Sequence, residues 1–238
     1  MTTPLRERLG LGEHELVSIV GAGGKSTILR TLGEELAEAN ARVVLTTTTM
    51  LAESQVREPA CWSDLPSEIE ARLSPGVPLF VVAGRVPGKV TGPSATAVDR
   101  IYAETSADFV LVEADGARHM LIKAPAEHEP VIPAASTTVI VTASIAAIGA
   151  RISDVAHRPE LVAALAGLNV NDPVSTGAAA RVLLHPTGGL KGIPRTARVV
   201  MAIAKVTPET EASADELAAI LSEHARVDRV VPVLSAEY

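Results

Sequence analysis

The chain has 238 residues, a formal net charge of −7, and 47% hydrophobic but only 2% aromatic residues. Its hydrophobic content is enough for a buried core, which excludes global disorder, and its length fits one large α/β domain or two small ones. Few aromatic rings and an acidic balance argue against nucleic acid as a partner, because such sites need stacking faces and basic patches.

Short apolar runs rich in β-branched residues alternate with helical patterns along the chain. The runs predict buried strands at 16–20, 42–45, 78–83, 108–112, 137–142, 197–202 and 229–233. The helical patterns lie at 26–39, 66–73, 94–105, 159–168 and 212–225. This alternation predicts a single α/β domain over 1–238, with a mostly parallel sheet of about seven strands and helices on both faces. Residues 144–195, rich in Gly, Pro, Asn and Asp, are expected to form an insertion or small subdomain.

Cysteine usage and the apolar stretches bear on the compartment. Cys61 is the single cysteine, so it has no partner for an internal disulfide and a reducing compartment fits. Residues 1–12 have no apolar signal core. The longest apolar stretch, 139–150, is shorter than the roughly 20 residues of a membrane span. We therefore expect a cytoplasmic protein with no membrane partner.

A glycine-rich loop follows the first predicted strand and opens the first long helix. It reads Val20-Gly21-Ala22-Gly23-Gly24-Lys25-Ser26-Thr27. Glycines let backbone amides curl inward, and a helix N-terminus adds free N–H groups, so the loop is expected to cradle the phosphates of a nucleotide. Lys25 would reach the β- and γ-phosphates, and the Ser26 hydroxyl would coordinate Mg²⁺. The predicted fold is therefore P-loop NTPase-like, and a nucleoside triphosphate (ATP or GTP) with Mg²⁺ is the expected cofactor.

The loop departs from the general P-loop pattern, because Ile19 stands where that pattern has its first glycine. Its shorter form resembles the ATP-binding loop of Mur-type ligases. A tight strand-to-helix turn is the structural alternative. A second glycine-lysine element, Gly84 to Lys89, lacks an adjacent Ser or Thr, and Pro87 removes one N–H. This element fits a flexible loop better than a second phosphate loop.

Two carboxylates and a glycine end the strand predicted at 108–112. Glu113 and Asp115 are candidate Mg²⁺ ligands, and Gly116 could donate its N–H to the terminal phosphate. An ordinary strand-to-loop junction is the alternative. Thr46 to Thr49 close the strand predicted at 42–45, where the hydroxyls, Thr47 and Thr48 among them, would bind phosphate oxygens or Mg²⁺, or serve only as strand residues and a turn cap.

Cationic residues follow the acidic strand end. Arg118 or Lys123 could neutralise charge on a transferred phosphoryl group. His128 could ligate a metal, but no second His or Cys stands at a standard spacing. A surface loop with local charge pairs is the other interpretation of this segment.

Lysine is rare in this chain, which has 16 arginines and five lysines. All five lysines fall in segments that we expect near the carboxyl ends of the strands. They are Lys25, Lys89, Lys123, Lys191 and Lys205. A compact, flexible ammonium group is one reason to keep lysine at such places, and compositional bias is the other.

Several of these motifs together resemble the YqeC proteins, described as selenium-dependent molybdenum hydroxylase accessory or selenium cofactor biosynthesis proteins. The resemblance covers nearly the whole chain. It is carried by the glycine loop, the threonine run, Val112-Glu113-Ala114-Asp115-Gly116-Ala117-Arg118, Lys123-Ala124-Pro125-Ala126-Glu127-His128-Glu129-Pro130, His157-Arg158-Pro159-Glu160 and Gly188-Gly189-Leu190-Lys191-Gly192-Ile193-Pro194. It implies a nucleotide-binding protein that helps to mature a molybdenum hydroxylase, with a molybdenum cofactor or a selenium-containing small molecule as a further ligand.

Two departures from the family pattern concern the site. Similar proteins often carry a lysine after the threonine run, where this chain has Met50. They also tend to have Leu-Asn-Lys-x-Asp late in the chain, which resembles a guanine-reading motif. Here Ala204 and Thr207 replace the Asn and the Asp, and Lys205 alone remains to stack its stem on a purine. Guanine specificity is not expected from a site without its base partners.

Three functions remain open from the sequence. The first is an enzyme, either a nucleoside triphosphatase or a nucleotidyl or phosphoryl transferase, acting in hydroxylase maturation. In that enzyme Lys25, Glu113, Asp115, Arg118 and Lys123 would carry the chemistry, mainly by positioning and charge stabilisation. The second is a nucleotide-gated delivery factor that docks a hydroxylase through 144–195. The third is a Mur-like ligase, for which 238 residues leave little room for a ligation domain.

Overall fold

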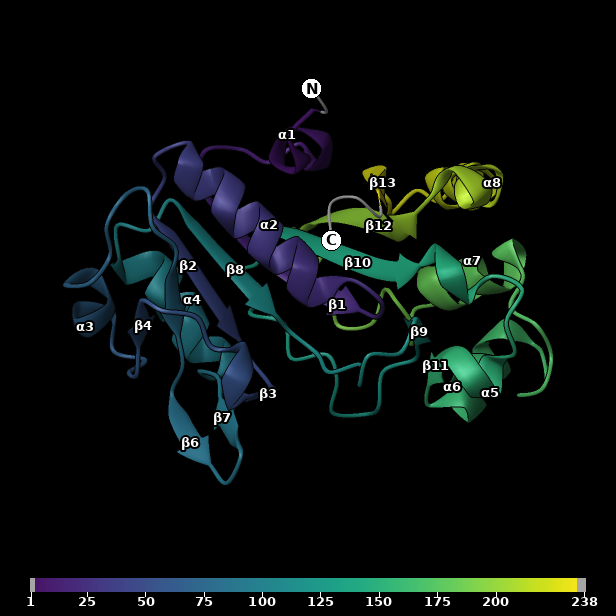
Figure 1. The fold of residues 1–238 in the computed structure, drawn as a ribbon, viewed down its shortest axis with the longest axis horizontal. Coiled ribbons are helices and arrows are strands. Elements are labelled where there is room, and N and C mark those ends of the chain that lie inside the picture. Colours follow the sequence, from purple (N-terminus) through teal and green to yellow (C-terminus); the bar gives the residue numbers. More distant parts are fainter. Residues whose placement is uncertain (1–2, 235–238) are drawn as a thin grey trace.

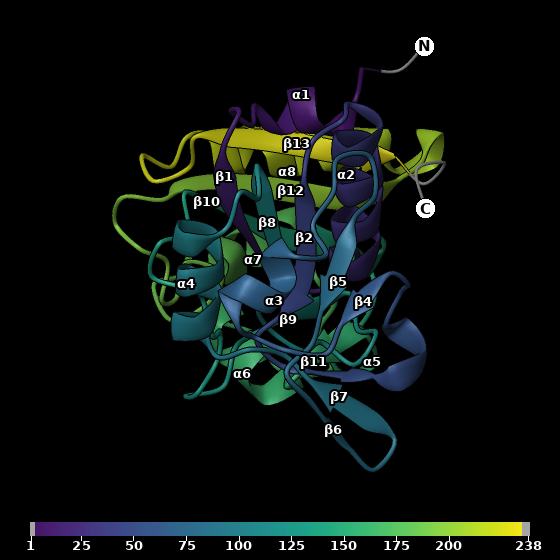
Figure 2. The same ribbon diagram turned by 90° about the vertical axis from the view of Figure 1, so that its left-hand side faces the viewer.

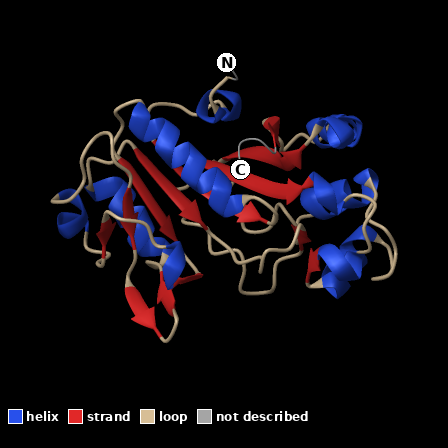
Figure 3. Cartoon of the chain, in the orientation of Figure 1, coloured by secondary structure: helices blue, strands red, loops and turns tan. Residues whose placement is uncertain are grey.

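The computed structural model describes residues 3–234, so the ends of the expected 1–238 domain lie outside the described residues. Its centre is an eight-stranded sheet in the order β13-β12-β10-β1-β8-β2-β5-β4, and every pairing in it is parallel (Figures 1 and 3). The strands are β1 (Glu15–Gly21), β2 (Val43–Thr47), β4 (Ala60–Cys61), β5 (Leu79–Val81), β8 (Phe109–Glu113), β10 (Thr138–Ser144), β12 (Arg198–Val206) and β13 (Arg229–Leu234). All seven predicted strands form, and the α/β class with a mostly parallel sheet is confirmed. The two-residue edge strand β4 was not predicted.

Helices cover both faces of this sheet, which makes three layers (Figure 2). On one face lie α1 (Leu5–Leu9) and α2 (Lys25–Glu38). On the other lie α3 (Pro66–Glu70), α4 (Ala95–Glu104), α5 (Ile152–Val155), α6 (Pro159–Ala166), α7 (Thr176–Leu184) and α8 (Glu211–Ser222). The five predicted helices are α2, α3, α4, α6 and α8, and the structure adds the others. No helix in residues 3–234 is long and apolar enough to cross a membrane.

The alternation of side chains along β1 explains the layers. Val17 and Ile19 are fully buried against the side chains of α2, among them Ile28 and Leu32, whereas Leu16 and Val20 join the core on the opposite face. A strand buried on both faces reads as a continuous apolar run, which is why the sequence predicts it well.

Two small sheets stand beyond the carboxyl ends of the main strands (Figure 1). The antiparallel sheet contains β3 (Met50–Ala52), β6 (Gly84–Val86) and β7 (Lys89–Thr91), and the parallel pair contains β9 (Ile122–Lys123) and β11 (Ala156–His157). The prediction of a flexible loop at Gly84–Lys89 is therefore wrong, because β6 and β7 form a hairpin. Pro87 and Gly88, whose φ is 71°, turn the chain between them, and Pro followed by a residue with positive φ suits a tight turn.

Candidate functional site

The glycine loop after β1 needs glycine at two positions. Gly21 and Gly23 have φ angles of 97° and 81°, which favour glycine. A Cβ on Gly21 would lie 2.2 Å from the carbonyl oxygen of Thr142, and one on Gly23 would lie 2.6 Å from the Cβ of Ser144. The loop is thus pressed against the end of β10, and this close approach fixes its course into α2.

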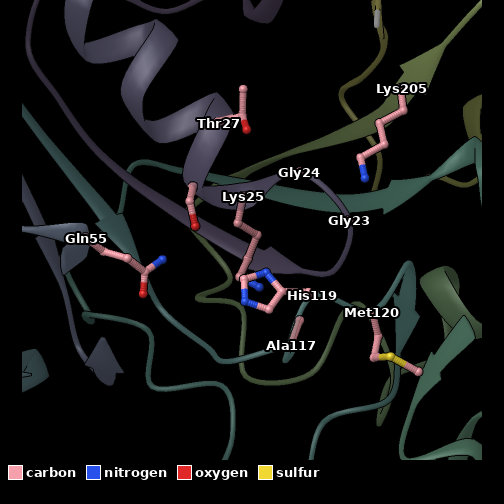
Figure 4. A pocket seen from close by; sticks show the side chains of 10 residues that line it. Gly23, Gly24, Lys25, Thr27, Gln55, Ala117, His119, Met120 and Lys205 are labelled. Atoms are coloured by element: carbon pink, nitrogen blue, oxygen red, sulfur yellow. The ribbon is translucent and has the colours of Figure 1, made fainter. Parts of the chain in front are cut away.

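Backbone donors of the loop fall into two groups. The N–H of Gly21 donates to Asp115 Oδ2 at 3.1 Å, and the N–H of Ala22 donates to the Thr142 carbonyl at 2.8 Å. From Gly23 to Thr27 the loop lines a cavity of about 260 Å³, named here the loop cavity (Figure 4). Because the first N–H groups of a helix have no partner inside it, the start of α2 presents donors and partial positive charge to this cavity.

Other elements complete the loop cavity. Lys205 near the end of β12, Gln55 after β3, and His119 and Met120 after β8 line it beside the glycine loop (Figure 4). Of the predicted site residues, Gly23 to Thr27 and Lys205 therefore border this cavity. Gly21 and Ala22 do not line it, and their N–H groups are bound to Asp115 and to the Thr142 carbonyl. Three lining residues were not predicted as site residues: Gln55, His119 and Met120. They are far from the glycine loop in the sequence, so no local pattern indicates that they lie beside it.

A cation and two carboxylates meet at the base of the glycine loop. Lys25 is 5% exposed, donates to the Gly21 carbonyl at 2.8 Å, and lies 3.3 Å from Asp115 Oδ1 and 3.8 Å from Glu113 Oε1. The Ser26 hydroxyl donates to Glu113 Oε2 at 2.8 Å. The start of α2 and the end of β8 with the residue two places beyond it bring these four side chains together.

The donor set at this point suits Mg²⁺. That ion is usually held by one or two carboxylates together with phosphate oxygens and water. Ser26 and Glu113 lie at hydrogen-bond distance from each other, and the buried Asp115 Oδ1 has no hydrogen-bond partner in residues 3–234. No cluster of three or more His, Cys, Asp and Glu that could hold a metal occurs in that range, so phosphate oxygens would have to supply further ligands.

Burial sets the protonation of Glu113. Burial raises the pKa of this carboxyl above its ordinary value, although Lys25 and the Ser26 hydroxyl pull it down. The folded protein then keeps a proton that the unfolded chain releases, so Glu113 lowers the free energy of unfolding as the pH rises above about 4.5.

We therefore expect Glu113→Gln to raise the melting temperature of the ligand-free protein at pH 7.5 and to have little effect at pH 4. The amide keeps the size of the side chain and removes the cost of ionising a buried carboxyl group. Lys25 still has its ion pair with Asp115. Melting curves at the two pH values measure this. A lower melting temperature for the variant at pH 7.5 would show that the ion pair with Lys25 outweighs the burial of Glu113.

Ion pairs continue from Asp115 into the neighbouring segment. Lys123 on β9 is 2.9 Å from Asp115 Oδ2 and 2.9 Å from Glu129 Oε2, and it donates to the Gly116 carbonyl at 2.7 Å. Arg158, directly after β11, binds both oxygens of Glu129. The Lys123 ammonium is thus directed into the protein, where it holds Asp115 in place. Glu129 and Arg158 are not among the predicted site residues, although both lie in the motifs that carry the family resemblance.

Burial raises the pKa of Glu129, but hydrogen bonds from Arg158 and Lys123 outweigh it and lower the value to about 2. Glu129 is therefore ionised at neutral pH.

The hydroxyls of the threonine run form hydrogen bonds with carbonyls of neighbouring segments. Thr46 donates to the Val81 carbonyl at 2.8 Å, Thr47 to the Glu113 carbonyl at 2.7 Å, and Thr48 to the Val131 carbonyl at 2.7 Å. Thr46 and Thr47 are fully buried, and Thr48 and Thr49 border a second cavity. In this structure the hydroxyls of Thr46 and Thr47 donate to carbonyls of adjacent strands.

The second cavity, named here the basic cavity, has a volume of about 790 Å³ and adjoins the loop cavity through Gln55 and His119. Gly116, Arg118 and His128 line it. The predicted residues Arg118, Gly116 and Thr48 thus lie together, on the opposite side of Gln55 and His119 from the glycine loop.

A three-layer α/β fold, with a glycine loop that ends in Lys-Ser against the carboxylates of a neighbouring strand, defines a protein of P-loop NTPase-like fold. The model of one family, YqeC protein, matches residues 17–160. The uncharacterized protein YqeC of Escherichia coli (strain K12) is 32% identical over 213 residues, which are 88% of this chain and 83% of that protein. The chain belongs to the YqeC family.

Proposed function

We propose that this protein binds a nucleoside triphosphate, ATP or GTP, together with Mg²⁺, as a nucleoside triphosphatase or a nucleotidyl or phosphoryl transferase. The observation that carries the proposal is the hydrogen bond between Ser26 and Glu113 beside the ammonium of Lys25, next to a cavity lined by Gly23 to Thr27 at the start of α2. Anions favour such helix N-termini, and Mg²⁺ favours a hydroxyl and a carboxylate next to phosphates.

Each side chain would have a separate task. The amides of the loop would hold the phosphates, and Lys25 would leave Asp115 to reach the β- and γ-phosphates. Ser26 and Glu113 would hold Mg²⁺, which supplies charge neutralisation at the phosphates when it is bound. Lys205 would place its aliphatic stem against the base. Arg118 would face the transferred group, and Lys123 would keep Asp115 in position.

The biological setting proposed here comes from the family resemblance. Proteins of this kind are described as accessory to selenium-dependent molybdenum hydroxylases. We propose that this chain acts in the maturation of such a hydroxylase, with a molybdenum cofactor or a selenium-containing small molecule as a ligand.

Three linked interactions also favour a second candidate function, a nucleotide-gated delivery factor that docks a hydroxylase. Asp115 accepts from the Gly21 amide and pairs with Lys123 on β9, which pairs in turn with β11 in the 144–195 segment. If Lys25 moved away from Asp115, the change would therefore reach the 144–195 segment through Lys123 and the β9–β11 pairing. Hydrolysis strongly stimulated by the partner hydroxylase, without a modified small molecule, would favour delivery over a transferase.

Thermal unfolding with ATP, GTP and CTP, each with and without Mg²⁺, tests the nucleotide proposal. Ligand at about 100 times its dissociation constant stabilises by roughly 2.7 kcal/mol. For a domain of this size we expect a rise of roughly 5–10 °C with at least one nucleotide, and a larger rise with Mg²⁺. A folded protein whose melting temperature changes with none of the three would overturn the proposal.

A further inference from the structure

The basic cavity is larger than the loop cavity and is built from different elements. Its walls are the end of the threonine run with β3, the hairpin strand β7, the loop that follows β8, and the residues at β11. Its volume of about 790 Å³ falls within the roughly 300–1,000 Å³ of small-molecule sites. It has room for a molecule much larger than an inorganic ion.

Positive charge dominates the lining of this cavity. Lys89, Arg118 and Arg158 supply this charge. His119, His128 and His157 also line the cavity, and burial together with the nearby Arg158 lowers the pKa of His157, so that its ring is neutral at neutral pH. Glu129 is the one carboxylate among the lining residues in the part of the chain that the structure describes, and both its oxygens are bound by Arg158.

Two of these cations have no acidic partner. No ion pair of Arg118 or Lys89 with a carboxylate occurs in residues 3–234, whereas Arg158 in the same cavity is paired with Glu129. The charged residues that line the cavity are mainly cations, although the whole chain carries a net charge of −7. Unpaired cations in a concave site attract anions.

The backbone gives an independent reason to regard the cavity as a binding site. Arg118, His119 and Arg158 have φ angles of 48°, 62° and 65°. The left-handed conformation costs a residue with a Cβ roughly 1–2 kcal/mol, and such strain gathers at functional sites. Among non-glycine residues 3–234 with positive φ, Asn40 is the one that lines neither the loop cavity nor the basic cavity.

We propose that the basic cavity binds a small molecule through a phosphate-type oxyanion, with Arg118 and Lys89 as the main contacts. Gln55 and His119 border both cavities, so this anion would lie next to the phosphates that the glycine loop would hold. The place of this molecule as a second ligand beside a nucleotide rests on the proposed function. The binding of the anion itself does not.

Calorimetric titration with inorganic phosphate at fixed ionic strength tests this site. The Lys25→Ala background is used beside the wild type, because it weakens any binding of phosphate at the glycine loop. We expect saturable binding in both proteins. In the Lys25→Ala background, Arg118→Gln should weaken it at least about tenfold, because a charged hydrogen-bond donor is lost, and Lys89→Gln should weaken it as well.

Arg85→Gln is the matched control, since Arg85 lies on the same hairpin but pairs with Glu53 and stacks on Trp62. It should leave the binding of phosphate unchanged. Absence of saturable binding, or binding that Lys25→Ala removes and Arg118→Gln does not, would overturn the inference. Phosphate binding that depends on Arg118 in a protein that binds no nucleotide would support the basic cavity and refute only the proposed function.

Discussion

Lys123→Met is expected to lower the melting temperature by roughly 6–20 °C. The Lys123 side chain is 2% exposed and pairs with Asp115 and Glu129, each at 2.9 Å. Removing one partner of a buried ion pair costs about 3–5 kcal/mol, because the other charges stay buried without compensation. In a domain of this size each kcal/mol corresponds to about 2–4 °C. Differential scanning calorimetry at pH 7.5 measures the change.

Two comparisons make this prediction specific. Arg100→Met removes an exposed pair with Glu104 on α4 and should change the melting temperature little. The effect of Lys123→Met should also shrink as the pH falls from about 5 towards 2. Glu129, whose pKa is about 2 in the folded protein, contributes stability above its ordinary pKa of 4.5, and that contribution is lost on acidification. Equal losses for Lys123→Met and Arg100→Met would contradict a stabilising role for the buried pairs.

Lys25→Ala is expected to remove most of the stabilisation by a nucleotide. Loss of a charged hydrogen bond to phosphate weakens affinity about ten- to a hundredfold. At a ligand concentration about 100 times the wild-type dissociation constant, the stabilisation would fall from roughly 2.7 kcal/mol to between about 0.4 and 1.4 kcal/mol. Melting curves with and without nucleotide and Mg²⁺ give both values.

The fold of Lys25→Ala should persist with a lower melting temperature in the absence of ligand, because Asp115 keeps Lys123 and the Gly21 amide as partners but the buried Glu113 loses the Lys25 ammonium. Lys25, Lys89 and Lys205 line the two cavities, Lys123 pairs with Asp115, and Lys191 donates to the carbonyls of Ala126 and Glu127. The control is therefore Arg100→Ala on α4, which should keep the full shift with nucleotide. An undiminished shift in Lys25→Ala would place the phosphates away from the glycine loop.

The main strands and helices could be predicted because their signals are local. Continuous apolar runs mark strands buried on both faces, and 3.6-residue periodicity marks the helices. The edge strand β4 has two residues, Ala60 and Cys61, which are too few for a pattern. The hairpin at Gly84–Val86 and Lys89–Thr91 has no clear sequence signal because each of its strands is three residues long, and Gly84 and Lys89 are weak strand formers.

Some residues of the candidate site can likewise be predicted from local motifs, whereas others are brought there only by long-range contacts. Lys25, Ser26, Glu113 and Asp115 follow from short motifs at the carboxyl ends of adjacent parallel strands, which meet at one edge of the sheet. Gln55 comes from a segment with no regular pattern. Glu129 and Arg158 meet across 29 residues through the β9–β11 pairing, which no local pattern predicts. The hydroxyl of Thr47 donates to the neighbouring strand, a detail fixed by strand register rather than by composition.

A structure of the protein with a non-hydrolysable triphosphate analogue and Mg²⁺ tests the central proposal most directly. We expect the β- and γ-phosphates on the amides of Gly23 to Thr27, with the ion between Ser26 and Glu113. The Lys25 ammonium should have left the Gly21 carbonyl and Asp115 for the phosphates. A triphosphate bound elsewhere, with Lys25 still on the Gly21 carbonyl, would contradict the account.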